Sequence, residues 1–143
     1  MSGFRLKWFL FLGAFVAFFG GCEKKDFTKE PATMHWDRDM CERCKMAISD
    51  RKFAVQAVDE KNRVYKFDDI GCLVLWHKLE HPEVKFKKIW ITDAKTGKWI
   101  DAKKACYKEG FITPMGYGYG ALEHGENCLR FEDVKKAIER IGR

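Results

Sequence analysis

The densest group of reactive side chains lies between Met40 and Met46, where the sequence reads Met-Cys-Glu-Arg-Cys-Lys-Met. Thiolate and thioether sulfurs are soft ligands that favour Cu(I) over hard ions such as Mg²⁺ and Ca²⁺. If the backbone is extended from Cys44 to Met46, the two side chains lie on the same side, because strand side chains repeat every second residue. The segment therefore predicts that Cys44 and Met46 chelate one Cu(I) ion.

A third copper ligand is expected at Met115, within the sequence Thr113-Pro114-Met115-Gly116. The proline stiffens the approach to the methionine, and the glycines that follow allow the backbone to come close to another segment. The alternative is that Met46 and Met115 fill gaps in a small hydrophobic core, as methionines commonly do. Three further residues are candidate auxiliary ligands: Cys41, His35 and Cys72.

The spacing of Cys41 and Cys44 has two other interpretations. C-x-x-C is a redox motif when it begins a helix after a strand. Here the preceding residues are polar, so no thiol with a lowered pKa at a helix N-terminus is predicted, although the pair could oxidise to a disulfide. A structural zinc site normally has a second pair of ligands at short spacing, whereas the remaining cysteines are single: Cys72, Cys106 and Cys128.

The first 22 residues resemble a bacterial lipoprotein signal. Arg5 and Lys7 precede an apolar run from Trp8 to Phe19, which is too short to span a bilayer, and Phe19-Gly20-Gly21-Cys22 resembles a lipobox. We expect residues 1–21 to be a signal peptide and Cys22 to carry a lipid. The protein is then extracytoplasmic, on the periplasmic or cell-surface side of a bacterial membrane, with ordinary secretion as the alternative.

Charge and cysteine content narrow the possible functions. The net charge is +6, but the lysines are scattered and form no single stripe. They favour a solvated surface facing anionic headgroups over nucleic-acid binding. Of six cysteines, lipidation of Cys22 leaves an odd number, so at least one thiol is free, joined to another chain or bound to a metal.

The elements expected around these residues make an α+β domain with a small, mostly antiparallel sheet. Residues 22–34 are expected to be the lipidated cysteine and a flexible tether, followed by a single domain at 35–143. The patterns predict a hairpin over 53–67, a helix after Asp68 and Asp69 that ends at Pro82, and a strand over 86–91. A turn at 93–97, a glycine-rich segment at 114–120 and an amphipathic helix over 131–141 follow.

Several short motifs in this order resemble the NosL copper lipoproteins. They are the signal with Cys22, the Met40–Met46 segment, Phe67-Asp68-Asp69, Trp90-Ile91-Thr92-Asp93, residues 97–102 (Gly-Lys-Trp-Ile-Asp-Ala) and Thr113-Pro114-Met115-Gly116. The resemblance implies two ββαβ units related to the organomercurial lyases. Because the stretch after Gly120 is short for the family, the second unit is expected to be incomplete.

The same resemblance implies that Cys44, Met46 and Met115 bind one Cu(I), and that the protein is no enzyme. It implies delivery of copper to nitrous oxide reductase, together with the ABC-type accessory complex of that pathway. Copper would move by ligand exchange, with a partner's sulfur joining before the first ligand leaves. Two alternatives stay open: a copper lipoprotein that serves another cuproenzyme, and an enzyme, either a thiol oxidoreductase or, by fold analogy alone, a carbon–mercury lyase.

Overall fold

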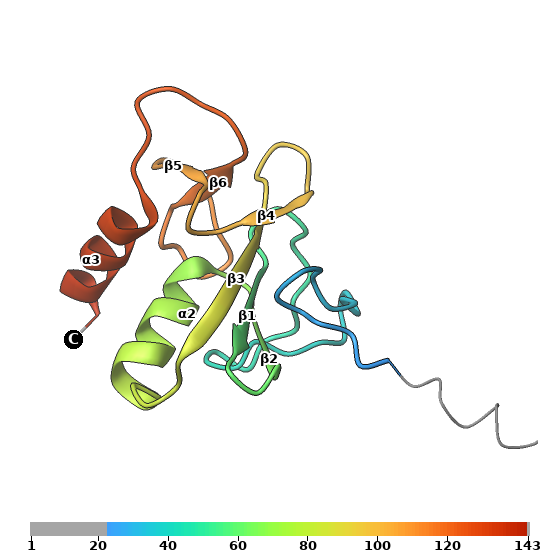
Figure 1. Cartoon of the computed structure of the whole chain (residues 1–143). Coiled ribbons are helices and arrows are strands. Elements are labelled where there is room, and N and C mark those ends of the chain that lie inside the picture. The colour runs from blue at the N-terminus through green and yellow to red at the C-terminus, as the bar shows by residue number, and fades with distance from the viewer. Residues whose placement is uncertain (1–22, 143) are drawn as a thin grey trace, which may run out of the picture.

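A four-stranded antiparallel sheet forms the centre of the molecule. The structure, a computed structural model, describes residues 23–142, so the predicted signal peptide and Cys22 lie outside the described residues. The strand order is β2-β1-β3-β4 (Figure 1). The hairpin predicted over 53–67 is present as β1 (Val55–Asp59) and β2 (Val64–Phe67). Asn62 takes a positive φ of 63° in the turn between them, which asparagine tolerates better than most residues.

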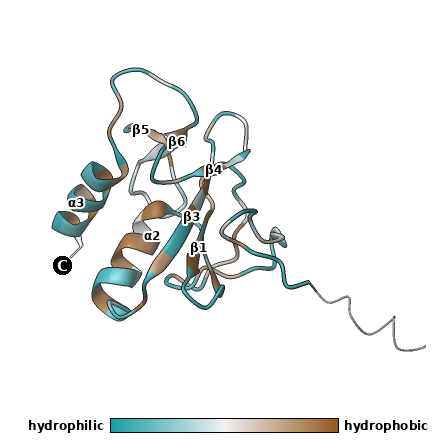
Figure 2. Cartoon of the chain, viewed as in Figure 1, coloured by the Kyte–Doolittle hydropathy of each residue, from teal (hydrophilic) through white to brown (hydrophobic). Residues whose placement is uncertain are grey.

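The predicted helix after the hairpin begins where expected. Asp69 is the N-cap of α2 (Ile70–Leu75), and its side chain accepts a hydrogen bond from the backbone N–H of Gly71. The helix continues as a π-helical turn (Trp76–Glu80) and stops before Pro82. All six residues of α2 are buried, and Figure 2 shows apolar residues along α2 and β1, so the helix covers one face of the sheet.

The last two strands of the sheet follow the helix. β3 (Phe86–Thr92) pairs with β1, and β4 (Trp99–Asp101) pairs with β3. Val55 and Ala57 of β1 pair with Ile91 and Ile89 of β3, and all four are buried in one cluster with residues of α2. The order β1–β2–α2–β3 is one complete ββαβ unit, which confirms the expected fold class.

The second half of the chain forms a smaller structural unit than the first. β5 (Cys106–Lys108) and β6 (Gly120–Leu122) form a two-stranded antiparallel sheet, and α3 (Phe131–Ile141) packs beside α2 (Figure 1). The hydropathy of α3 is mixed in Figure 2, and its buried residues are Phe131, Val134 and Ile138. No strand follows α3 in the part of the chain that the structure describes. The second unit is therefore strand, strand and helix, as the short C-terminal stretch predicts.

The segment before the domain differs from the flexible tether that its polar composition predicts. Asn62 bonds the backbone of Phe27 and of Lys25, and the Trp90 indole donates to the Phe27 carbonyl at 2.8 Å. Gln56, on the face of the sheet opposite α2, exchanges two hydrogen bonds with the backbone of Ala32. Because side chains of the sheet and of its β1–β2 turn form hydrogen bonds with the backbone of this segment, residues 25–34 are part of the fold.

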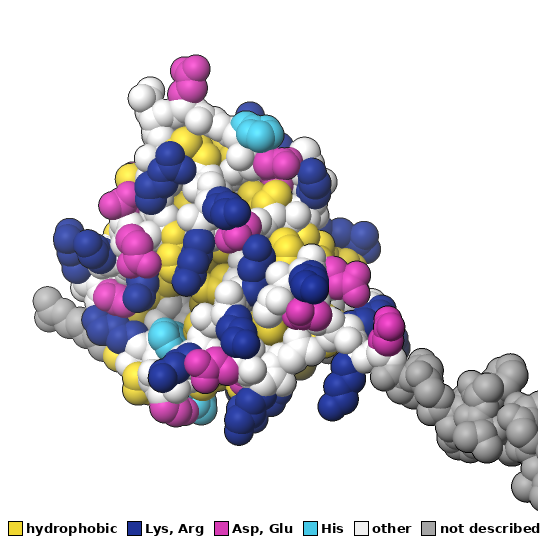
Figure 3. Space-filling view, in the orientation of Figure 1, with side chains coloured by type: hydrophobic (Ala, Val, Ile, Leu, Met, Phe, Trp, Pro, Cys, Tyr) yellow, Lys and Arg dark blue, Asp and Glu magenta, His cyan; other side chains and the backbone are white. Residues whose placement is uncertain are grey.

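Two surface properties bear on function. Figure 3 shows lysine and arginine side chains spread over one face and interleaved with acidic ones, in agreement with the scattered basic residues of the sequence. Among residues 23–142, the structure has no helix with both the length and the apolar character needed to cross a membrane.

Candidate metal centre

The Cys41–Cys44 segment forms a tight turn that backbone hydrogen bonds hold in place. The Cys41 N–H donates to the Met46 carbonyl at 2.9 Å, and the Lys45 N–H donates to the Cys41 carbonyl at 3.1 Å. Lys45 has a φ of 60°, which is left-handed backbone. The expectation of an extended Cys44-Lys45-Met46 segment is therefore wrong, and strand alternation does not place the two sulfurs on one side.

The end of the hairpin and the start of α2 place two more potential metal ligands next to this turn. β2 ends at Phe67, so that Asp68 follows directly and Cys72 lies in the first turn of α2. The turn is held against this junction because the Glu42 N–H donates to the Lys66 carbonyl at 2.9 Å. Two segments that are separate in sequence, the Cys41–Cys44 turn and the junction of β2 with α2, thus meet at this corner.

The result is a compact cluster of three thiols and one carboxylate. The ligand atoms of Cys41, Cys44, Asp68 and Cys72 all lie within 4.8 Å of one another. The Cys44 thiol donates to Asp68 at 3.3 Å, and the Cys72 thiol donates to the other carboxylate oxygen at 3.5 Å. Cys41, Cys72 and Asp68 are buried, whereas Cys44 is partly exposed. Cys44 is therefore the cysteine of the cluster that a partner can reach.

Hydrogen bonds lower the pKa of Cys41 to about 6. The Cys72 thiol makes the largest contribution, and the backbone N–H groups of Cys44, Asp68 and Arg43 act in the same direction, against the effect of burial. The sequence predicted no such thiol, because no helix starts here. A turn that aims several N–H groups at one sulfur stabilises a thiolate without a helix.

The other two thiols hold their protons more strongly. Burial raises the pKa of Cys44 to about 12, helped by its hydrogen bonds to Cys41 and Asp68 and opposed by the Met46 N–H. The hydrogen bond to Cys41 raises the pKa of Cys72 further, together with burial and the nearby negative charge. The metal-free cluster thus holds one thiolate and two thiols, and each thiol has a single proton that either Cys41 or Asp68 can accept.

The predicted methionine ligands lie at the rim of this cluster. Met46 is 54% exposed, and its N–H group bonds the Cys44 sulfur. Met115 is 38% exposed, and its N–H donates to Asp69 at 3.1 Å, next to Asp68. The backbones of both residues are thus near the cluster, and their role as ligands stays a prediction. His35 is exposed, and its ring nitrogens are not among the clustered atoms.

Tyr117 packs over the first turn of α2. A Cβ added to Gly71 would lie 2.1 Å from the Tyr117 ring, so only glycine allows this close approach. Burial raises the pKa of Tyr117, and Cys72 and Cys44 add to the effect. The loop that carries Met115 is thus fixed to the helix next to Cys72.

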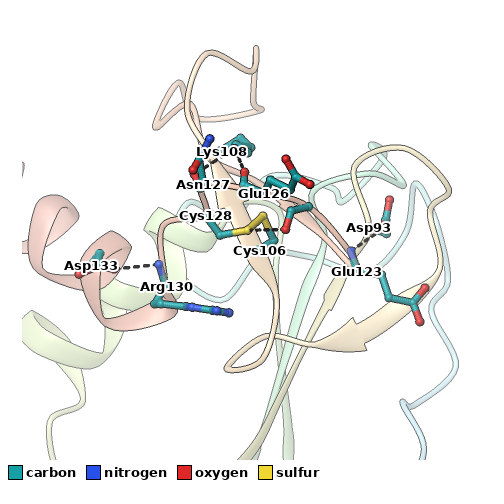
Figure 4. The surroundings of a disulfide bond; sticks show 10 residues. Asp93, Cys106, Lys108, Glu123, Glu126, Asn127, Cys128, Arg130 and Asp133 are labelled. Atoms are coloured by element: carbon teal, nitrogen blue, oxygen red, sulfur yellow. Dashed lines mark hydrogen bonds between the residues drawn. A yellow bond between two sulfur atoms is a disulfide. The ribbon is translucent and has the colours of Figure 1, made fainter.

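The remaining two cysteines of the described chain are joined to each other. Cys106 and Cys128 form a disulfide that links β5 to the segment before α3 (Figure 4). Lys108 donates to the carbonyls of Glu126 and Asn127 in the same loop. The disulfide removes these two thiols from the metal-ligand candidates, so that the free cysteines among residues 23–142 are the three of the cluster.

Asp68 is the residue that sequence reasoning missed. Of the two aspartates before the helix, Asp69 alone caps it, and Asp68 turns toward the thiols. The available signal was the spacing Asp68-x-x-x-Cys72, a second ligand pair to accompany Cys41-x-x-Cys44.

The arrangement can be compared with proteins of known structure. The chain is similar to the crystal structure of the copper chaperone NosL from Shewanella denitrificans, with a TM-score of 0.52 and 18% sequence identity. The match covers 76% of this chain and 86% of that chain. The chain has a NosL-like fold. No protein-family model matches the sequence, and no curated protein matches it either.

Proposed function

We propose that this protein is a NosL-type copper carrier, which is exported, anchored through Cys22 and loaded with one Cu(I). It delivers copper to nitrous oxide reductase with the ABC-type accessory complex. The observation that carries the proposal is the convergence of three free thiols within 4.8 Å on a NosL-like fold. The proposal makes the protein a binding protein and not an enzyme.

The chemistry of the cluster suits a soft monovalent ion. Cu(I) prefers thiolate and thioether sulfur, and Cys41 already holds a thiolate. The partial exposure of Cys44 gives a partner's sulfur a position from which to join the ion before another ligand leaves. Met46 and Met115, both exposed beside the cluster, supply additional soft ligands during this exchange. Copper then passes to the partner without becoming free in solution.

An anaerobic Cu(I) titration against a competing chelator tests the binding. The full chain, reduced and in detergent, should bind one Cu(I), and Cys44→Ser should weaken binding. Met40→Leu is the matched control, because Met40 is 51% exposed and flanks the turn without belonging to the predicted ligands. Met46→Leu and Met115→Leu test the thioethers. Unchanged affinity in Cys44→Ser would reject this copper site.

Anchoring and delivery need their own tests in cells. Cys22→Ser should abolish lipid labelling and release the exported protein from the membrane fraction, with Cys41→Ser as a control that stays in the membrane. Loss of the protein should lower the copper content of nitrous oxide reductase but not of other cuproenzymes. A loss of copper from an oxidase instead would favour the alternative recipient.

One observation favours a second candidate, thiol–disulfide exchange. The lowered pKa of Cys41 beside two other thiols is a property that redox-active cysteines share. Cys41 is fully buried, however, which hinders attack on a protein disulfide. Reduction of a protein disulfide by the metal-free chain, lost in Cys41→Ser, would favour this function over copper delivery.

A further inference from the structure

We propose that the same cluster is a complete four-ligand site for Zn(II), in which Asp68 completes the set formed by Cys41, Cys44 and Cys72. The inference rests on the proposed metal-binding function and extends it to a second class of ion. The ligands come as two close pairs, Cys41-x-x-Cys44 and Asp68-x-x-x-Cys72. Structural zinc sites are characteristically built from two such pairs.

The positions of the four atoms fit this ion. Around a tetrahedral zinc with Zn–S distances of about 2.3 Å, neighbouring ligand atoms lie about 3.8 Å apart. In the metal-free cluster every pair is within 4.8 Å, so no pair of ligand atoms has to approach by more than about 1 Å. Thiolate sulfur and carboxylate oxygen are both ordinary zinc ligands.

The hydrogen bonds of the cluster already point its ligands inward. Asp68 accepts from Cys44 through one oxygen and from Cys72 through the other, so that the carboxylate faces both sulfurs. An ion bound among these atoms takes the place of the two thiol protons. Backbone N–H groups meanwhile bond the sulfurs of Cys41 and Cys44 from outside, which orients these ligands and stabilises their negative charge.

Charge near the site supports an anionic metal complex. Three thiolates and a carboxylate around Zn(II) carry a net charge of −2. Arg43 lies within the Cys41–Cys44 turn, and its Nε is buried without a hydrogen-bond partner among the described residues. The Arg43 Nε lies 3.7 Å from the carboxylate of Glu80, which is exposed. Arg43 thus contributes one positive charge from the turn that holds two of the ligands.

Asp68 should contribute differently to the binding of Zn(II) and of Cu(I). Cu(I) is bound by sulfur and gains little from a carboxylate, whereas Zn(II) accepts oxygen and usually takes four ligands. Removing the carboxylate charge of Asp68 should therefore weaken zinc binding and leave Cu(I) binding nearly unchanged. This difference makes the fourth ligand testable without a structure of the loaded protein.

The experiment compares Asp68→Asn with the unmodified protein, using the full chain, reduced and in detergent. Zinc affinity is measured with a chromogenic chelator, and Co(II) replaces zinc as a spectroscopic probe of tetrahedral thiolate coordination. We expect one Zn(II) per chain, a loss of zinc affinity of at least about tenfold in Asp68→Asn, and less than about a threefold change for Cu(I). Asp69→Asn is the matched control, since Asp69 is equally buried and adjacent but caps the helix.

Each outcome decides the inference. If zinc binding is lost selectively in Asp68→Asn and retained in Asp69→Asn, Asp68 is a ligand. An equal loss of both ions would mean that Asp68 only supports the fold, which overturns the proposal. Failure of the unmodified protein to bind Zn(II) while it binds Cu(I) overturns the zinc site and leaves the copper function standing. As a second variant, Cys72→Ser should weaken zinc binding and remove the Co(II)–thiolate bands contributed by that sulfur.

Discussion

The pH dependence of Cu(I) affinity should report how many thiols bind the ion. Between pH 7 and pH 8 the medium lies above the pKa of Cys41, about 6, and below that of Cys44, about 12. The pKa of Cys72 is raised as well. In this window Cys41 is already a thiolate, whereas the other two must each release a proton when a metal binds.

The sign and the magnitude follow from proton linkage. Protons compete with the metal for the sulfurs, so affinity rises with pH, and each proton released contributes a factor of about ten per pH unit. Binding by all three thiols therefore predicts that Cu(I) affinity rises about 100-fold from pH 7 to pH 8. Binding by Cys44 with two methionines predicts about tenfold, because thioethers carry no proton.

The assay is a competition titration at both pH values, corrected for protonation of the chelator, with direct measurement of proton release in weak buffer. Cys72→Ser provides the internal control, because the loss of one thiol should reduce the dependence to about tenfold. A tenfold dependence in the unmodified protein would refute three-thiol binding and leave one proton-releasing thiol, as in the predicted set of Cys44, Met46 and Met115 or in the pair of Cys41 and Cys44. A dependence that Cys72→Ser leaves unchanged would remove Cys72 from the site.

Three stability changes test the surrounding fold. Replacing Cys106 and Cys128 by alanine removes a crosslink of sequence separation 22. This should lower the free energy of unfolding by about 3.4 kcal/mol and the Tm by about 13 °C, and leave the Cu(I) affinity unchanged. Reduction of the unmodified protein should lower the Tm equally, and a smaller shift in the double-alanine variant would contradict the prediction. Gly71→Ala drives a Cβ into the Tyr117 ring and should cost about 1–3 kcal/mol in urea unfolding, less when Tyr117 is also truncated. Asp69→Ala removes the α2 N-cap and should cost about 1 kcal/mol, whereas Asp69→Asn, which can still cap, should cost less.

Local patterns predicted the elements of the fold well. The turn at Asn62 set the hairpin, Asp69 and Pro82 set the limits of the helix, and the apolar period from Phe131 to Ile141 set the last helix. Each of these signals acts within a few residues of the element that it defines. The strands β5 and β6 lie in a glycine-rich region of weak pattern, and the sequence did not predict them.

The site was predicted only in part because it depends on contacts between distant segments. The sequence identified Cys44 and named Cys41 and Cys72 as auxiliary residues, and the structure brings these three together. The sequence could not show that Lys45 adopts a left-handed backbone conformation, which changes the direction of the chain before Met46. Nor could it show which of two adjacent aspartates faces the thiols, since both fit a helix start equally well.

The docking of residues 25–34 on the sheet limits how far an anchored domain could move. Two residues separate Cys22 from Lys25, whose carbonyl accepts a hydrogen bond from Asn62. The three Cα-to-Cα steps from Cys22 to Lys25 span at most about 10 Å. A lipid on Cys22 would thus keep the β1–β2 turn close to the bilayer surface, at a distance limited by this short segment. The cluster lies at the other end of β2, roughly 17 Å along the strand direction from Arg63 to Asp68. An anchored molecule would then have limited freedom to reorient, and its partner would have to reach the thiols close to the membrane.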